Sequence, residues 1–119
     1  MRPTARMGNL IVHAHRTTSD AALFKCLLSE VRRQGRPFGL WIRDLSGGQT
    51  NTSSYGYQAF KGEARMVYKV DAKTGAKTLV RGVDLVGTPL ATLTKIIAAG
   101  QTSGVFNGYC GAESGMVPV

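Results

Sequence analysis

The chain has 119 residues, of which 43% are hydrophobic and 18% are charged. This length and composition predict one folded domain over residues 1–119 and exclude an intrinsically disordered chain. No run approaches the roughly 20 apolar residues that a membrane-spanning helix needs, so we expect no membrane partner.

Fifteen Lys and Arg residues against seven Asp and Glu residues give a net charge of +8, which suits an anionic partner such as nucleic acid. The bases are spread from Arg2 to Lys95, however, and only Arg32, Arg33 and Arg36 cluster. They cluster where a helix is predicted to end and where cations are favoured by the helix dipole. The pattern therefore argues against nucleic acid as the main partner.

The chain has two cysteines, Cys26 and Cys110. Its N-terminus lacks the apolar stretch of a secretory leader, which predicts reduced thiols and a cytoplasmic location. Pairing of Cys26 with Cys110 stays open at this point.

The first elements follow from periodicity and capping residues. Residues 9–15 alternate and are typical of a strand, and Thr17 to Asp20 supply caps for a helix. Apolar residues spaced three and four apart predict this helix over Ala21 to Gln34, about four turns long. Gly35 is expected to end it, and Pro37 prevents its continuation.

A sheet is predicted next. Phe38 to Leu45 is expected to form a strand that Ser46-Gly47-Gly48 breaks, and Gln49 to Tyr55 an irregular loop. Tyr57 to Val70 again alternates. Asp71 to Gly75 resembles a hairpin connection that returns through Lys77 to Arg81.

A second helix of about three turns is predicted near residue 94. Thr88 can cap it, Pro89 suits its first turn, and Gly100 is expected to end it. Leu90, Leu93, Ile96 and Ile97 would form its apolar face. With an extended end at Met116 to Val119, the fold class is α+β, a mostly antiparallel β-sheet with two short helices.

Few residues suggest chemistry by themselves. Cys110 lies between Gly108 and Gly111, where a flexible backbone suits either a metal ligand or nucleophile, or a small buried thiol in a turn. Glu113 could shape that turn or approach a metal. His13 and His15 share one face of the predicted strand and could chelate a metal, but solvated histidines fit equally well.

The remaining candidates favour structural roles. Cys26 lies in the first helix and is expected in the core. Tyr55 and Tyr57 could stack on a ligand or simply pack. Neither Glu63 nor Glu113 has a second carboxylate or base near it in the sequence, and no phosphate-binding glycine loop is present.

Five segments in order carry a resemblance to a known family, and they extend over nearly the whole chain. The segments are Arg6-Met7-Gly8-Asn9-Leu10, Gly47-Gly48-Gln49, the strand pair Glu63 to Val70 and Lys77 to Arg81, the stretch Arg81 to Gly87, and the tail from Cys110-Gly111 to Val117-Pro118-Val119. Together they resemble the C-terminal part of the TldD/PmbA zinc metallopeptidases, formerly described as modulators of DNA gyrase.

The resemblance implies a zinc-dependent hydrolase that acts on peptides or unfolded segments, as in peptide maturation, and that forms homo- or heterodimers. In catalytic members of this family, two histidines of a His-Glu-x-x-x-His helix and a cysteine near the C-terminus hold zinc. Cys110 matches that cysteine. Such a site leaves a fourth zinc position for a water whose pKa the metal lowers.

The chain lacks a His-Glu-x-x-x-His motif, so the resemblance places no catalytic residue in it. We expect a piece of a longer enzyme that contributes Cys110, binds zinc weakly by itself and is inactive alone. Two alternatives are a non-catalytic partner subunit of a TldD/PmbA heterodimer and, less favoured, a small basic nucleic-acid-binding domain. A standalone interaction module without chemistry is a third.

Overall fold

A computed structural model describes residues 8–51, 58–112 and 115–119. Within them the chain is α+β, as predicted, and its strand pairs are antiparallel apart from one short parallel pair. The elements are β1 (Thr17–Thr18), α1 (Asp20–Arg33), β2 (Phe38–Asn51), β3 (Ala59–Asp71), β4 (Lys77–Val80), β5 (Asp84–Gly87), α2 (Pro89–Leu93), β6 (Ala99–Gly100), β7 (Tyr109–Ala112) and β8 (Gly115–Pro118).

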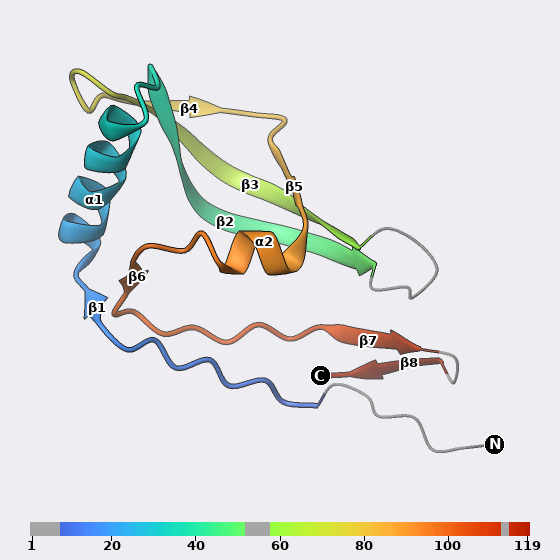
Figure 1. Ribbon diagram of the computed structural model, residues 1–119. Coiled ribbons are helices and arrows are strands. Elements are labelled where there is room, and N and C mark those ends of the chain that lie inside the picture. The colour runs from blue at the N-terminus through green and yellow to red at the C-terminus, as the bar shows by residue number, and fades with distance from the viewer. Residues whose placement is uncertain (1–7, 52–57, 113–114) are drawn as a thin grey trace.

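The main sheet is built around β3. It pairs with β2 along one edge and with β4 and then β5 along the other. α1 stands at one end of this sheet, while the β7–β8 hairpin and the extended N-terminal segment lie together on another side (Figure 1). The parallel pair of β1 with β6 joins those segments near the start of α1.

The first helix agrees closely with its prediction. Ser19 is the N-cap, and its hydroxyl accepts a hydrogen bond from the Ala22 N–H at 3.3 Å. Gly35 has φ +64°, the left-handed conformation that ends helices at glycine. Thr17 and Thr18, which were expected to help cap the helix, instead form β1.

Val31 of α1 and Val70 of β3 are buried where the helix meets the sheet. Val31 of α1, Val67 and Val70 of β3, and Ala72 are the buried apolar residues among those described. Phe24 meets Trp41 edge to face, with 5.4 Å between ring centroids. The Lys77 ammonium lies 4.3 Å from the centroid of the Phe24 ring, so β4 adds a cation–π contact to this aromatic pair.

Three sequence expectations about elements are wrong. Residues 9–15 form no strand: residues 9–14 have no regular secondary structure and His15 lies in a bend, because alternation alone does not supply a partner strand. β2 does not break at Ser46-Gly47-Gly48. It continues to Asn51, with register shifts between Ile42 and Gly47 that absorb the irregularity. Residues 52–55 of the expected loop, and Tyr57 at the start of the next strand, lie outside the described residues.

The length of the second helix is the third of these errors, although the helix begins where predicted, with Pro89 in its first turn. It ends at Leu93, and Thr88 occupies the N-cap position without a side-chain hydrogen bond. Ile96 and Ile97 follow the helix in irregular chain, and Gly100 lies in β6 rather than at a helix end. The apolar residues that predicted three turns, Leu90, Leu93, Ile96 and Ile97, are all more than 60% exposed.

The hairpin predicted at Asp71 to Gly75 is confirmed, and so is the extended C-terminal end. β3 and β4 are antiparallel, and the Asp71 carboxylate accepts hydrogen bonds from the N–H groups of Lys73 and Thr74 at 2.9 and 2.8 Å. These bonds lower the pKa of Asp71, with those from Thr74 contributing most. The extended end becomes β8, which pairs with β7.

The hydrogen bonds of Glu30 at the C-terminal end of α1 can be tested through the pH dependence of stability. Hydrogen bonds from Arg33 first, and from Gln34 second, lower the pKa of Glu30 from 4.5 to about 2. Because the folded-state pKa is the lower one, the stabilisation is complete above pH 4.5 and is lost as the pH falls towards 2. Denaturant unfolding should therefore show wild type losing stability relative to Glu30→Gln over this interval. If the free energies of unfolding of the two proteins changed in parallel with pH, the lowered pKa of Glu30 would be contradicted.

Candidate functional site

A cavity of about 680 Å³ lies between the N-terminal segment, the far half of β2 and the C-terminal hairpin. Segments far apart in the sequence thus meet at one place. Its lining residues are Gly8, Leu10, Val12, Gly47, Gly48, Gly104, Phe106, Asn107, Gly108, Tyr109, Met116 and Val119. Five of them are glycines, so the wall exposes much backbone and carries no charged side chain.

Gly48 brings β2 close to β3 at this cavity. A Cβ on Gly48 would lie 2.6 Å from the backbone oxygen of Lys61, which is closer than real Cβ atoms approach such an atom. A Cβ on the neighbouring Gly47 would meet nothing within 4 Å. Close contact with β3 therefore requires glycine at position 48 but not at position 47.

The C-terminal hairpin closes the other side of the cavity. Beyond the β7–β8 ladder, Gly108 and Val119 exchange two backbone hydrogen bonds of 3.2 and 2.9 Å. Gly111 lies against Met116, whose sulfur would be 2.7 Å from a Cβ at position 111. The absence of a side chain at Gly111 thus allows Met116 to lie across the hairpin.

Cys110 is half-buried in β7 and pairs with Val117. Tyr109 and Met116 line the cavity, as do Gly108 and Val119 at the open end of the hairpin, whereas Cys110 is not among its lining residues.

The described residues do not form a complete zinc site. Among them, no three His, Cys, Asp or Glu side chains gather closely enough to hold a metal ion. His13 and His15 are exposed on the unpaired N-terminal segment, and Glu113 lies outside the described residues. Zinc sites need three or four protein ligands, so Cys110 could supply only one of them.

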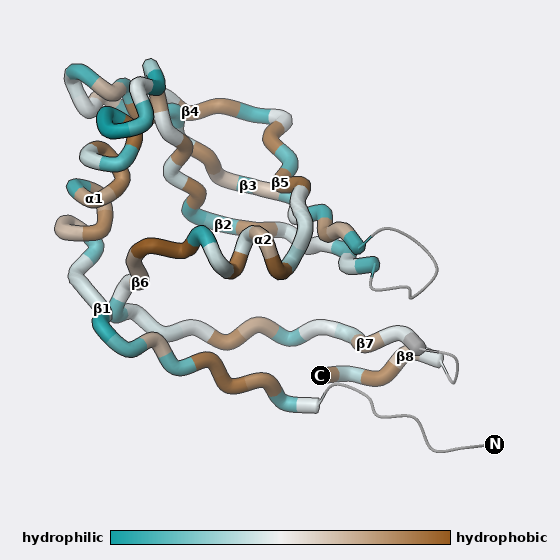
Figure 2. Tube along the Cα trace, in the orientation of Figure 1, coloured by the Kyte–Doolittle hydropathy of each residue, from teal (hydrophilic) through white to brown (hydrophobic). Residues whose placement is uncertain are grey.

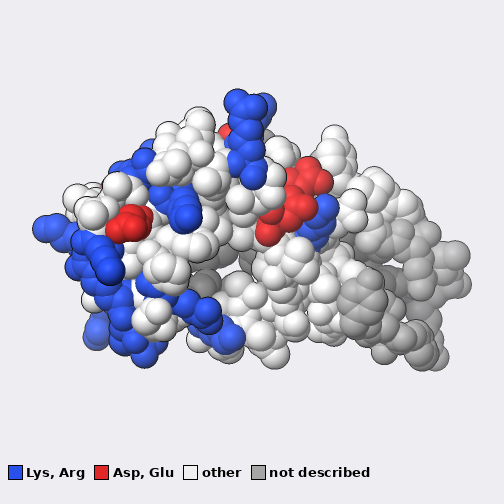
Figure 3. Space-filling model, turned by 90° about the horizontal axis from the view of Figure 1, so that it is seen from above, with Lys and Arg blue, Asp and Glu red and all other residues white. Residues whose placement is uncertain are grey.

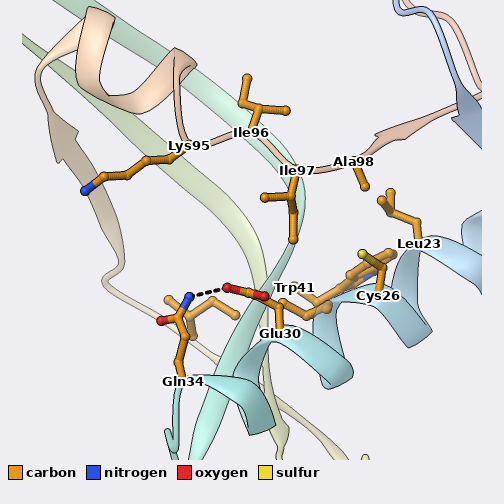
Figure 4. A pocket seen from close by; sticks show the side chains of 11 residues that line it. Leu23, Cys26, Glu30, Gln34, Trp41, Lys95, Ile96, Ile97 and Ala98 are labelled. Atoms are coloured by element: carbon orange, nitrogen blue, oxygen red, sulfur yellow. Dashed lines mark hydrogen bonds between the residues drawn. The ribbon is translucent and has the colours of Figure 1, made fainter.

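A second hollow of about 390 Å³ lies between α1, β2 and residues 95–98, and Cys26 lines it (Figure 4). Cys26 is a half-buried free thiol there, so the pairing with Cys110 that the sequence left open does not form. Ile97 points towards Trp41, and the Gln34 amide donates to Glu30 at the rim. Sequence reasoning missed this hollow because it placed Ile96 and Ile97 on a helix.

Basic side chains gather towards the α1 end of the molecule, away from the cavity (Figure 3). Within the predicted cluster, the Arg32 Nε donates to the Ala72 carbonyl at 2.6 Å, and Arg33 is bonded to Glu30. Arg32 thus ties the helix end to the turn after β3, whereas the Arg33–Glu30 bond lies within α1. Tyr55 and Tyr57, the candidate stacking residues, lie outside the described residues.

Comparison with known proteins gives no relative: no family model, curated protein or solved structure matches the chain. In the described part of the chain, no helix has the length and apolarity needed to cross a membrane.

Proposed function

We propose that this chain is the C-terminal portion of a TldD/PmbA-type zinc metallopeptidase and contributes Cys110 to its metal site. The supporting observation is the cavity. Gly8, Gly47 with Gly48, and Gly108 belong to or adjoin three of the segments that carry the resemblance, and all line this one cavity. A chance resemblance gives no reason for those segments to converge.

The proposed substrate is a peptide or an unfolded segment. The glycine-rich cavity wall exposes backbone, which can contact an extended peptide without reading its side chains. A neighbouring hollow of about 560 Å³ runs between residues 9–13 and 103–107. Within the described chain, residues 102–107 make no backbone hydrogen bond, so their N–H and C=O groups are available to such a peptide.

The remaining parts of the proposal come from the family. The other zinc ligands would be histidines of a His-Glu-x-x-x-His helix, and the assembly would be a homo- or heterodimer. A cytoplasmic location agrees with the free thiol of Cys26. The 119 residues alone are expected to bind zinc weakly and to cleave no peptide.

The test is zinc content and cleavage of an unfolded peptide in a full-length TldD/PmbA protein carrying Cys→Ser at the position matching Cys110. We expect zinc affinity and cleavage to fall by more than about 100-fold, because a direct ligand matters more than its supporting shell. Cys→Ser at the position matching Cys26 is the control and should retain both. Unchanged zinc occupancy in the first variant would refute the ligand assignment.

A further inference from the structure

A separate hollow of about 630 Å³ lies where the C-terminal end of α1 meets the turn between β3 and β4. Its basic lining residues are Arg32, Arg36 and Lys73, and its acidic one is Asp71. The volume lies within the range of about 300–1,000 Å³ that is usual for small-ligand sites. It shares no lining residue with the candidate cavity, so the metallopeptidase function gives it no role.

The cations of this hollow come from two segments that are far apart in the sequence. Arg32 and Arg36 lie at the end of α1, whereas Lys73 lies in the turn after β3. Lys69 and Lys77, on the strands that flank this turn, add positive charge nearby. Figure 3 shows basic side chains gathered towards this end, and Figure 2 shows hydrophilic chain at the end of α1 and in the neighbouring turn. The fold therefore brings together bases that are scattered in the sequence.

Two of these cations have no acidic partner. Among the described residues, neither Arg36 nor Lys73 forms an ion pair. The Asp71 carboxylate instead accepts hydrogen bonds within its own turn, from the N–H groups of Lys73 and Thr74 and from the Thr74 hydroxyl. The Arg36 guanidinium and the Lys73 ammonium are thus available to an anion from outside the chain.

The two walls of the hollow are tied to each other by hydrogen bonds. The Arg36 N–H donates to the Val31 carbonyl at 3.0 Å, which fixes the chain after α1. The Ala72 N–H donates to the Pro37 carbonyl at 3.0 Å, and the Arg32 Nε donates to the Ala72 carbonyl at 2.6 Å. Little backbone ordering is therefore needed when a ligand enters between the helix end and the turn.

We propose that this hollow binds a small, multiply charged phosphate anion, such as a polyphosphate or the phosphate tail of a nucleotide. Its three cations outweigh Asp71 and the roughly half negative charge at the C-terminal end of a helix. A phosphate group carries close to two negative charges, about −1.5 to −2 at pH 7, and accepts hydrogen bonds from guanidinium and ammonium groups. Among the described residues, no aromatic, hydroxyl or amide side chain lines the hollow, so the phosphates themselves are what it recognises.

The charges elsewhere on the sheet favour a compact anion over nucleic acid, which binds through many phosphate contacts along a basic track. Farther along β3, Lys61 is paired with Asp84 at 3.1 Å and Arg65 with Asp44 at 3.7 Å. β7 and β8 contain no Lys or Arg. The basic surface of β3 is thus neutralised beyond this end of the molecule.

Calorimetric titration of the 119-residue chain with tripolyphosphate tests the proposal, with wild type compared with Arg36→Gln and Lys73→Gln. Both side chains belong to exposed residues, so both changes spare the core. Arg32 is left unchanged, because its bond to Ala72 holds the turn. Wild type should bind tripolyphosphate. Each variant should raise the dissociation constant about 10-fold, the loss expected for one hydrogen bond to a charged group.

The matched controls are Lys61→Gln and Arg65→Gln, which remove the same groups from exposed side chains that are already paired with carboxylates. Both controls should keep the wild-type dissociation constant, and circular dichroism should show that all variants remain folded. A wild type that does not bind tripolyphosphate would overturn the proposal. Equal weakening by the controls would do the same, because net charge alone would then explain binding.

Titration with ATP, adenosine and duplex DNA identifies the source of the phosphate. We expect tripolyphosphate to bind at least as tightly as ATP, because the hollow offers no contact to a base; tighter binding of ATP would identify a nucleotide tail as the ligand. Binding of adenosine, or of duplex DNA that tripolyphosphate does not displace, would overturn the proposal. None of these titrations needs zinc or a peptide substrate, so the phosphate site and the zinc assignment can fail separately.

Discussion

Replacement of Gly48 by alanine should lower the free energy of unfolding by about 3 kcal/mol, near the upper end for overpacked sites. The new Cβ would lie 2.6 Å from the Lys61 carbonyl oxygen and 3.4 Å from the Gly62 Cα. Both atoms belong to the backbone of β3 and cannot rotate away as a side-chain end can. The β2–β3 ladder would have to separate at this point, beside the candidate cavity.

Gly47→Ala is the matched control for Gly48→Ala. It is the adjacent residue of β2, it lines the same cavity, and its Cβ would meet no atom within 4 Å. Denaturant unfolding of both variants should show a change within about 0.5 kcal/mol for Gly47→Ala. Similar losses in both variants would mean that general strand propensity, rather than contact with β3, governs these positions.

Gly47 and Gly48 also show which structural features could be predicted from the sequence alone. Consecutive glycines usually interrupt a strand, so Ser46-Gly47-Gly48 was expected to end one. In the folded chain Gly48 is required by the closeness of a neighbouring strand, a reason that only the three-dimensional pairing reveals. Local composition cannot distinguish a glycine that is needed for backbone flexibility from one that leaves space for a neighbouring strand.

Predictions that depended on local chemistry were more successful. α1 has its cap, its apolar spacing and its terminal glycine within the segment itself, so its bounds differ from the prediction by one residue at each end. Residues 9–15 and the residues after Leu93 carry equally suggestive patterns. Their structure depends on partners elsewhere, and the patterns alone gave the wrong element.

The candidate site shows the same limit. The sequence indicated the segment that contains Cys110. Gly8, Gly47 and Gly108 belong to separate segments of the sequence, and nothing in it predicted that they meet. It offered no signal for Phe106 or Asn107 as cavity residues, because the cavity forms where three distant segments meet. It also could not determine that Cys110 is not among the residues that line that cavity.

Gly39→Ala should be the other strongly destabilising change, by about 2 kcal/mol. Gly39 pairs with Val70, which is 0% exposed, where α1 crosses the sheet. A Cβ on Gly39 would lie 2.6 Å from Val31 Cγ2 and 3.2 Å from Leu27 Cδ1. Val31 is only 8% exposed, so its side chain has little room to move, and α1 would be pushed away from the sheet.

A double-mutant cycle with Val31→Ala tests this explanation. Val31→Ala alone should cost about 2 kcal/mol through lost burial, but it removes the methyl group that the new Cβ would strike. The double variant should therefore be more stable than the sum of the two losses predicts, by about 1 kcal/mol. Leu27 remains in tight contact, which is why the rescue is incomplete. If the losses in free energy of unfolding of the two single variants simply added up in the double variant, contact with α1 would not explain the effect of Gly39→Ala. The effect would then come from the backbone of β2 itself.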